Sequence, residues 1–139
     1  MDKFTRNYSI ALGVISVVVL AWLVYEDPQV SELNALLAAD AEINNYPYRF
    51  KVLNLQNGSA VMSTPRSAAF PVHRALGLLF PRLATRAQDD PDVMKAQQEL
   101  AEIQKRARAI VMASGKVKGV RWELDKNWLT RHGVQFSAP

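Results

Sequence analysis

The chain of 139 residues contains no cysteine and only two histidines, and it has no glycine-rich phosphate loop. Without cysteine there is no disulfide, no thiol nucleophile and no zinc site of the finger type. His73 and His132 have no second histidine at helical spacing and stand in no HExxH pattern. We therefore expect a protein that acts by binding, with no catalytic residues, no cofactor and no metal. An enzyme that uses His73 with a nearby serine is the alternative left open.

Charge is absent from one long run, Tyr8 to Tyr25, which reads YSIALGVISVVVLAWLVY. At about 1.5 Å per residue a helix over this run is roughly 27 Å long, close to the hydrocarbon thickness of a bilayer. A signal peptide is the competing interpretation, but the run exceeds a typical h-region and no small-x-small cleavage site follows it. We expect an uncleaved transmembrane anchor over residues 8–25, with Tyr8, Trp22 and Tyr25 at the membrane interfaces.

The charges beside this run predict its orientation. Lys3 and Arg6 precede it, whereas Glu26 and Asp27 follow it. Because basic flanks stay in the cytoplasm, residues 1–7 are expected inside and residues 26–134 outside, with 135–139 as a tail. The predicted location is the inner membrane of a bacterium, with a periplasmic domain. A mitochondrial origin would keep the topology and change the compartment.

The first half of the expected domain has clear local signals. Asp27-Pro28 can open a helix that runs to about Asp40, because Asp caps free N–H groups and Pro fits the first turn. Residues 41–47 are expected to form a loop. Asn57-Gly58 then predicts a hairpin with a type I′ turn, in which Leu55 faces Ala60 and Leu53 faces Met62.

The second half of the expected domain contains further helices and one strand, and prolines or capping residues mark where several of them begin. A short helix is expected within residues 72–80, and Asp90-Pro91 opens a long helix to about Ser114 whose outer face is expected to be solvated and ion-paired. Alternation over 116–125 predicts a half-buried strand, and Asp125 or Asn127 can cap a last short helix. The fold class is therefore α+β: a membrane helix and a sandwich of helices on a three-stranded sheet, in the order α-β-β-α-α-β-α.

This order resembles the BON domain, a small bacterial envelope module, over about half of the chain. The matching stretches are Val30-x-x-Leu33-x-x-x-Leu37 with Asp40, Val52 to Val61, and Ala107-x-x-Ile110-Val111 followed by Val117 to Val120 and Leu124. Residues 64–88 are then an insertion between the second strand and the second helix. The resemblance implies binding of phospholipid or another envelope component, and it brings no catalytic residues.

Acidic residues are absent between Glu42 and Asp89, where arginine is frequent. A short amphipathic helix with arginine flanks, next to a membrane, is typical of a contact with lipid headgroups or a protein. We take as candidate contact residues Arg66, Arg74, Leu76, Leu79, Phe80, Arg82 and Arg86. The plain alternative is that the apolar members pack into the core and the arginines form a solvated rim.

The functional expectation is a membrane-anchored periplasmic binding or scaffold protein, an accessory component of a cell-envelope assembly. Its expected partners are the bilayer, through residues 8–25, and an envelope protein. The alternative is a BON-like domain that binds anionic phospholipid at the membrane surface. Nucleic acid is not expected despite a pI of about 9.6, because the compartment is wrong.

Overall fold

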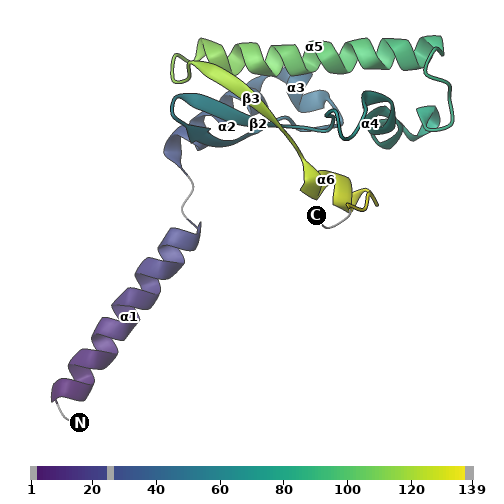
Figure 1. The fold of residues 1–139 in the computed structure, drawn as a ribbon. Helices are drawn as coiled ribbons and strands as arrows, with labels where there is room; N and C mark the ends of the chain where they lie inside the picture. Colours follow the sequence, from purple (N-terminus) through teal and green to yellow (C-terminus); the bar gives the residue numbers. More distant parts are fainter. Residues whose placement is uncertain (1–2, 25–26, 137–139) are drawn as a thin grey trace.

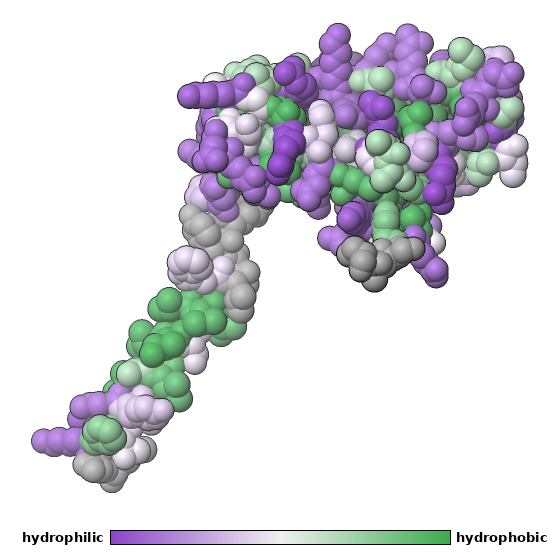
Figure 2. Space-filling model, viewed as in Figure 1, coloured by the Kyte–Doolittle hydropathy of each residue, from purple (hydrophilic) through white to green (hydrophobic). Residues whose placement is uncertain are grey.

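A long N-terminal helix stands apart from the rest of the chain. The computed structural model describes residues 3–24 and 27–136, and α1 spans Lys3–Val24. Figure 1 shows α1 projecting away from the other elements, and Figure 2 shows its apolar middle beyond a hydrophilic end. Tyr8 and Trp22 are 63% and 81% exposed, and Tyr25 lies outside the described residues. Lys3–Trp22 is the one stretch in the described chain that is long and apolar enough to cross a membrane.

The remaining described residues form a mixed helix and sheet structure, which confirms the predicted class and the three-stranded sheet. The elements are α2 (Pro28–Ala39), α3 (Ala41–Asn45), β1 (Val52–Gln56), β2 (Ser59–Thr64), α4 (Val72–Leu79), the 3-10 turn η1 (Pro81–Leu83), α5 (Pro91–Ala113), β3 (Gly119–Leu124) and α6 (Lys126–Arg131). Asp27, Asp90 and Asp125 cap α2, α5 and α6 with their side chains. These caps satisfy N–H groups that the first helical turn leaves free.

The predicted loop over residues 41–47 is wrong, because Ala41–Asn45 form the short helix α3. The carboxylate of Asp40 accepts a hydrogen bond from the Ile43 amide at 3.1 Å, and Ile43 is buried in the core. A cap at one end and a buried side chain in the middle hold a helix too short to form alone.

The sheet has the order β1-β2-β3, with β1 and β2 antiparallel and β2 and β3 parallel. Asn57 and Gly58 have φ of 51° and 82°, as the predicted type I′ turn requires. Leu55 lies opposite Ala60, which confirms that part of the register.

The predicted pairing of Leu53 with Met62 is wrong, because Val52 takes that place and the register shifts between Val52 and Asn54. The extra residue turns Val52 to the α5 side of the sheet, where it is buried with Phe50 and Met62, while Leu53 is 38% exposed. A β-bulge of this kind exchanges the faces of every residue before it.

The core lies between the sheet and α5, which crosses above the strands in Figure 1. One face of α5 is buried at helical spacing through Val93, Ala96, Leu100, Ile103, Ala107 and Val111. Tyr48, Phe50 and Trp122 meet as edge-to-face rings, with centroids 4.9 Å and 6.0 Å from the Phe50 ring. Figure 1 places α6 at the far end of β3, where Leu129 packs with Phe70 in a smaller cluster.

The two edges of the sheet differ. At the β1 edge, Asn34 of α2 accepts from the Val52 amide at 2.7 Å and donates to the Val52 carbonyl oxygen at 3.1 Å. At the β3 edge, no backbone hydrogen bond joins the outer side of the strand to any described segment. A side chain therefore covers the first edge at Val52, whereas no described residue covers the second edge anywhere along the strand.

Candidate functional site

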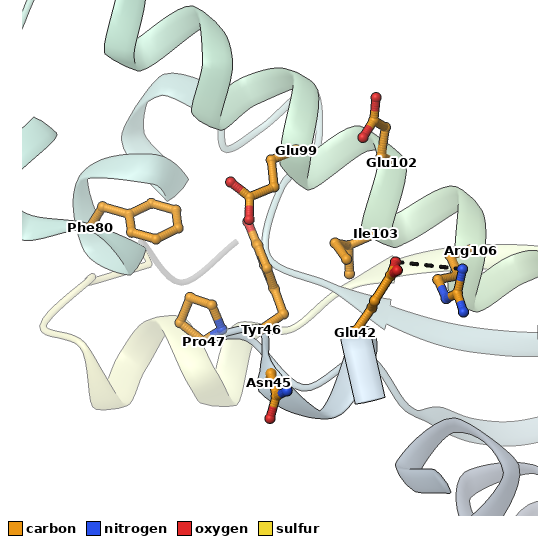
Figure 3. A pocket seen from close by; sticks show the side chains of 9 residues that line it. All are labelled: Glu42, Asn45, Tyr46, Pro47, Phe80, Glu99, Glu102, Ile103 and Arg106. Atoms are coloured by element: carbon orange, nitrogen blue, oxygen red, sulfur yellow. Dashed lines mark ion pairs between the residues drawn. The ribbon is translucent and has the colours of Figure 1, made fainter. Parts of the chain in front are cut away.

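A cleft of about 600 Å³ lies where α3, the end of α4 and the middle of α5 meet. Figure 3 shows the side chains that line it, which are Glu42, Asn45, Tyr46, Pro47, Phe80, Glu99, Glu102, Ile103 and Arg106. The four residues from α5 follow the i, i+3, i+4, i+7 spacing of one helix face. The cleft is therefore built by one face of a long helix and two chain segments that fold against it.

Aromatic side chains form the apolar wall of the cleft. The Tyr46 ring stacks on Phe50 and meets the edge of Phe80, with both centroid distances at 6.3 Å. Phe80 reaches the cleft because α4 ends at Leu79 and Pro81 begins the next turn. Tyr46 and Phe80 thus line the cleft beside carboxylates, and the Phe80 ring already holds one cation, the Arg82 guanidinium 5.8 Å from its centroid.

The Tyr46 hydroxyl is buried and has no hydrogen-bond partner among the described residues. Figure 3 shows its side chain running from α3 toward Glu99 on α5. Burial, followed by the negative charge of Glu99, raises the pKa of Tyr46 well above its ordinary value. The group is consequently a protonated donor at neutral pH, and a buried donor left unpaired costs free energy.

Acidic charge dominates the rim. Arg106 is held by Asp40 through Nε at 2.9 and 3.0 Å and through Nη2 at 2.8 Å, and it also lies 3.5 Å from Glu42. The hydrogen bonds from Arg106, first of all, lower the pKa of Asp40 below its usual value. Glu99 and Glu102 have no ion-pair partner in the part of the chain described. The pairing expected along the outer face of the long helix is absent for these two residues.

The apolar candidates from the sequence do not form a surface. Leu76 is fully buried and Leu79 is 9% exposed, both in the main core, and Phe80 is half-buried in the cleft wall. The apolar face of the amphipathic helix α4 is therefore covered by the rest of the domain. This is the arrangement that the plain alternative expected.

The four candidate arginines contact different residues. Arg66 donates to the Gln104 side-chain oxygen at 3.3 Å, and Arg86 pairs with Asp92 at 2.9 Å and with Asp90 at 3.4 Å. Arg74 lies over the Phe70 ring at 4.6 Å, and Arg82 lies over the Phe80 ring at 5.8 Å. Only Arg74 and Arg82 are exposed without an acidic partner among the described residues.

His73 does not meet a serine in the described structure. Its Nε2 lies 3.0 Å from the carbonyl oxygen of Arg86. No group of three or more metal-ligating side chains occurs within residues 3–24 and 27–136.

The sequence reasoning missed the cleft, although one signal was present. Glu99, Glu102, Ile103 and Arg106 share a helix face, but Tyr46 and Glu42 come from a segment taken as a loop. Comparison with known proteins found no matching family model, no similar curated protein and no similar solved structure. The BON-like resemblance accordingly stays a prediction.

Proposed function

We propose that the protein is a membrane-anchored, non-catalytic binding protein, an accessory component of a bacterial envelope assembly. In this proposal α1 and Tyr25 anchor the chain in the inner membrane, with the N-terminus in the cytoplasm and the domain in the periplasm. The length, apolarity and full exposure of the described part of α1 support the anchor. The basic residues before it and the acidic residues after it support the orientation.

The observation that carries the binding role is the cleft with two unpaired glutamates beside two aromatic rings. Glu99 and Glu102 favour a cation, and the half-buried Phe80 ring gives the apolar stem of a basic side chain a surface to pack on. The Tyr46 hydroxyl is a buried donor. After a small rotation of its side chain, a peptide carbonyl of the occupant would be a suitable acceptor. The occupant that fits these groups is a basic side chain, with its adjoining backbone, of a partner protein.

The test is a quantitative pull-down of the full chain from its own membranes in mild detergent. The double variant Glu99→Gln and Glu102→Gln removes the negative charge and keeps the shape of the cleft. We expect the partner recovered with the wild type to be lost with this variant and to elute earlier as salt is raised.

The matched control is Asp89→Asn, which removes an exposed carboxylate away from the cleft. Recovery of the partner should be unchanged with this control. Equal recovery by the double variant and the wild type would rule out the cleft as the binding surface.

A second candidate, binding of anionic phospholipid, is favoured by Arg74 and Arg82. Both guanidinium groups are exposed, and each is oriented by a ring beneath it, which suits contact with phosphate. The test is hydrogen exchange of the full chain in vesicles with and without phosphatidylglycerol. Lipid binding predicts slower exchange in α4 with the anionic lipid, reversed by Arg74→Gln and Arg82→Gln; unchanged exchange would contradict it.

A further inference from the structure

The outer edge of β3 leaves its backbone groups without a hydrogen-bond partner among the described residues. Its inner side continues the ladder to β2, with the Lys118 amide donating to Gly58 and the Asp125 amide donating to Thr64. No hydrogen bond to the outer side of Gly119–Leu124 is made by any residue in 3–24 or 27–136. Such an edge is a template for another strand.

The side chains of β3 decide which strand fits. Arg121 and Glu123 point to the face away from α5 and are exposed, whereas Val120, Trp122 and Leu124 point to the core side and are only half-buried. Charged residues usually discourage pairing at an edge. Here the two charged residues on either side of Trp122 have opposite signs. A second strand of the same sequence, running antiparallel, therefore places a negative charge opposite the positive one and a positive charge opposite the negative one.

We propose that β3 pairs antiparallel with β3 of a second copy of this chain, about a two-fold axis at Trp122. In this register Arg121 faces Glu123 of the second copy, and Glu123 faces its Arg121. Val120 likewise faces Leu124, so apolar side chains meet on the core side. The two sheets join into one of six strands, and at each edge that remains Asn34 holds the backbone groups of Val52.

The charges also exclude the neighbouring registers. A shift of the centre to residue 121 places arginine opposite arginine, and a shift to residue 123 places glutamate opposite glutamate. Like charges directly opposite each other destabilise a strand pair, whereas opposite charges stabilise it. The sequence of β3 therefore specifies one self-pairing and disfavours the others, which is the property of a two-fold interface.

The first experiment measures the mass of the full chain in detergent micelles by sedimentation equilibrium. We expect a monomer–dimer equilibrium in the wild type. Arg121→Glu alone and Glu123→Arg alone each turn two attractive pairs per dimer into repulsive ones. Each should raise the dimer dissociation constant about tenfold or more.

The same two variants provide their own rescue. In the double variant R121E/E123R both attractive pairs return with the signs exchanged, so the dimer should return to within about threefold of the wild-type affinity. Mixing the copy that carries Arg121→Glu with the copy that carries Glu123→Arg should give a heterodimer, although neither copy pairs well with itself. A general loss of folding would not be reversed by mixing.

The absence of cysteine permits a second, geometric test. Directly opposed residues in an antiparallel pair have Cα atoms about 4.5–5.5 Å apart, within the reach of a disulfide. Oxidation of mixed Arg121→Cys and Glu123→Cys copies in membranes should therefore give cross-linked dimers. Either copy alone should cross-link poorly, because its two cysteines are displaced along the strands.

Three results would overturn the proposal. One is a wild type that stays monomeric at every concentration tested. Another is a dimer whose affinity is the same in the charge variants and whose mixed cysteine copies do not cross-link. That result is expected if the α1 helices associate through Ser9 and Gly13 instead. The third is failure of the mixed charge variants to form a heterodimer. None of these outcomes bears on the cleft, so the proposed partner binding is tested separately.

Discussion

At the residue scale, two unusual side chains determine the character of the cleft. Arg106 is occupied by Asp40 and Glu42, so it does not neutralise Glu99 and Glu102. Tyr46 carries a buried hydroxyl that has no acceptor among the described residues. Both features have consequences for stability and binding that can be measured separately.

We expect Tyr46→Phe to leave the free energy of unfolding unchanged or to raise it by up to about 1 kcal/mol. The substitution removes an unpaired polar atom and keeps the ring that stacks on Phe50. Partner binding should weaken by up to about tenfold, because the occupant loses a donor. Urea unfolding of the full chain in detergent and the pull-down measure the two effects. A loss of stability above about 1 kcal/mol would show that the hydroxyl is hydrogen-bonded in solution.

The Asp40–Arg106 pair predicts a pH dependence. Because the pKa of Asp40 is lowered in the folded state, the pair stabilises the fold above the unfolded-state value of 3.8. That contribution is lost as the pH falls below 3.8 through the folded-state pKa. Asp40→Asn keeps the capping group of α3 and removes the charge, so the variant should have a lower urea midpoint than the wild type at pH 6.

The difference between the wild type and Asp40→Asn should change little above the unfolded-state value of 3.8 and shrink as the pH is lowered below it. Asp89→Asn is the control, because that exposed carboxylate makes no ion pair in the described chain. A difference that stays constant over this pH range would show that Asp40 contributes by hydrogen bonding alone.

At the element scale, the sheet is controlled at its edges. Asn34 occupies both backbone groups of Val52, so another chain cannot pair with β1 at that residue without displacing Asn34. The outer side of β3 has no such cover among the described residues. The edge of β3 is therefore the less protected of the two.

Asn34→Ala should lower the free energy of unfolding by about 1–3 kcal/mol, because it leaves the partly buried Val52 amide and carbonyl unpaired. Hydrogen exchange of the Val52 amide should become faster by at least about tenfold. Asn127→Ala, at an exposed position on α6, is the matched control and should change neither quantity. Unchanged exchange at Val52 would mean that the β1 edge is protected by something other than Asn34.

The elements that sequence reasoning identified are those with local causes. Asp27-Pro28, Asp90-Pro91 and Asn57-Gly58 each specify a helix start or a turn within a few residues, and the structure has all three. The bulge at Leu53 and the helix α3 were missed because they depend on distant packing. The cleft brings Glu42 and Tyr46 against residues of α5 that come much later in the chain, so it is invisible to local patterns.

At the scale of the whole molecule, an apolar helix is joined to a domain that has a cleft and an open sheet edge. The proposed topology predicts that a cysteine placed at Asp89 reacts with an impermeant maleimide in intact cells. A cysteine placed at Thr5 should react only after the membrane is opened, because that residue lies on the cytoplasmic side. The reverse labelling pattern would contradict the proposed orientation.

The central claim is that the cleft is occupied by a partner protein, and photocrosslinking in living cells tests it most directly. A photoreactive amino acid in place of Asn45 lies in the cleft and keeps all three glutamates, whereas the same group in place of Gln98 lies on α5 outside it. We expect one discrete protein adduct from position 45, abolished by Glu99→Gln with Glu102→Gln, and none from position 98. No adduct from position 45, or the same adduct from both positions, would contradict the account.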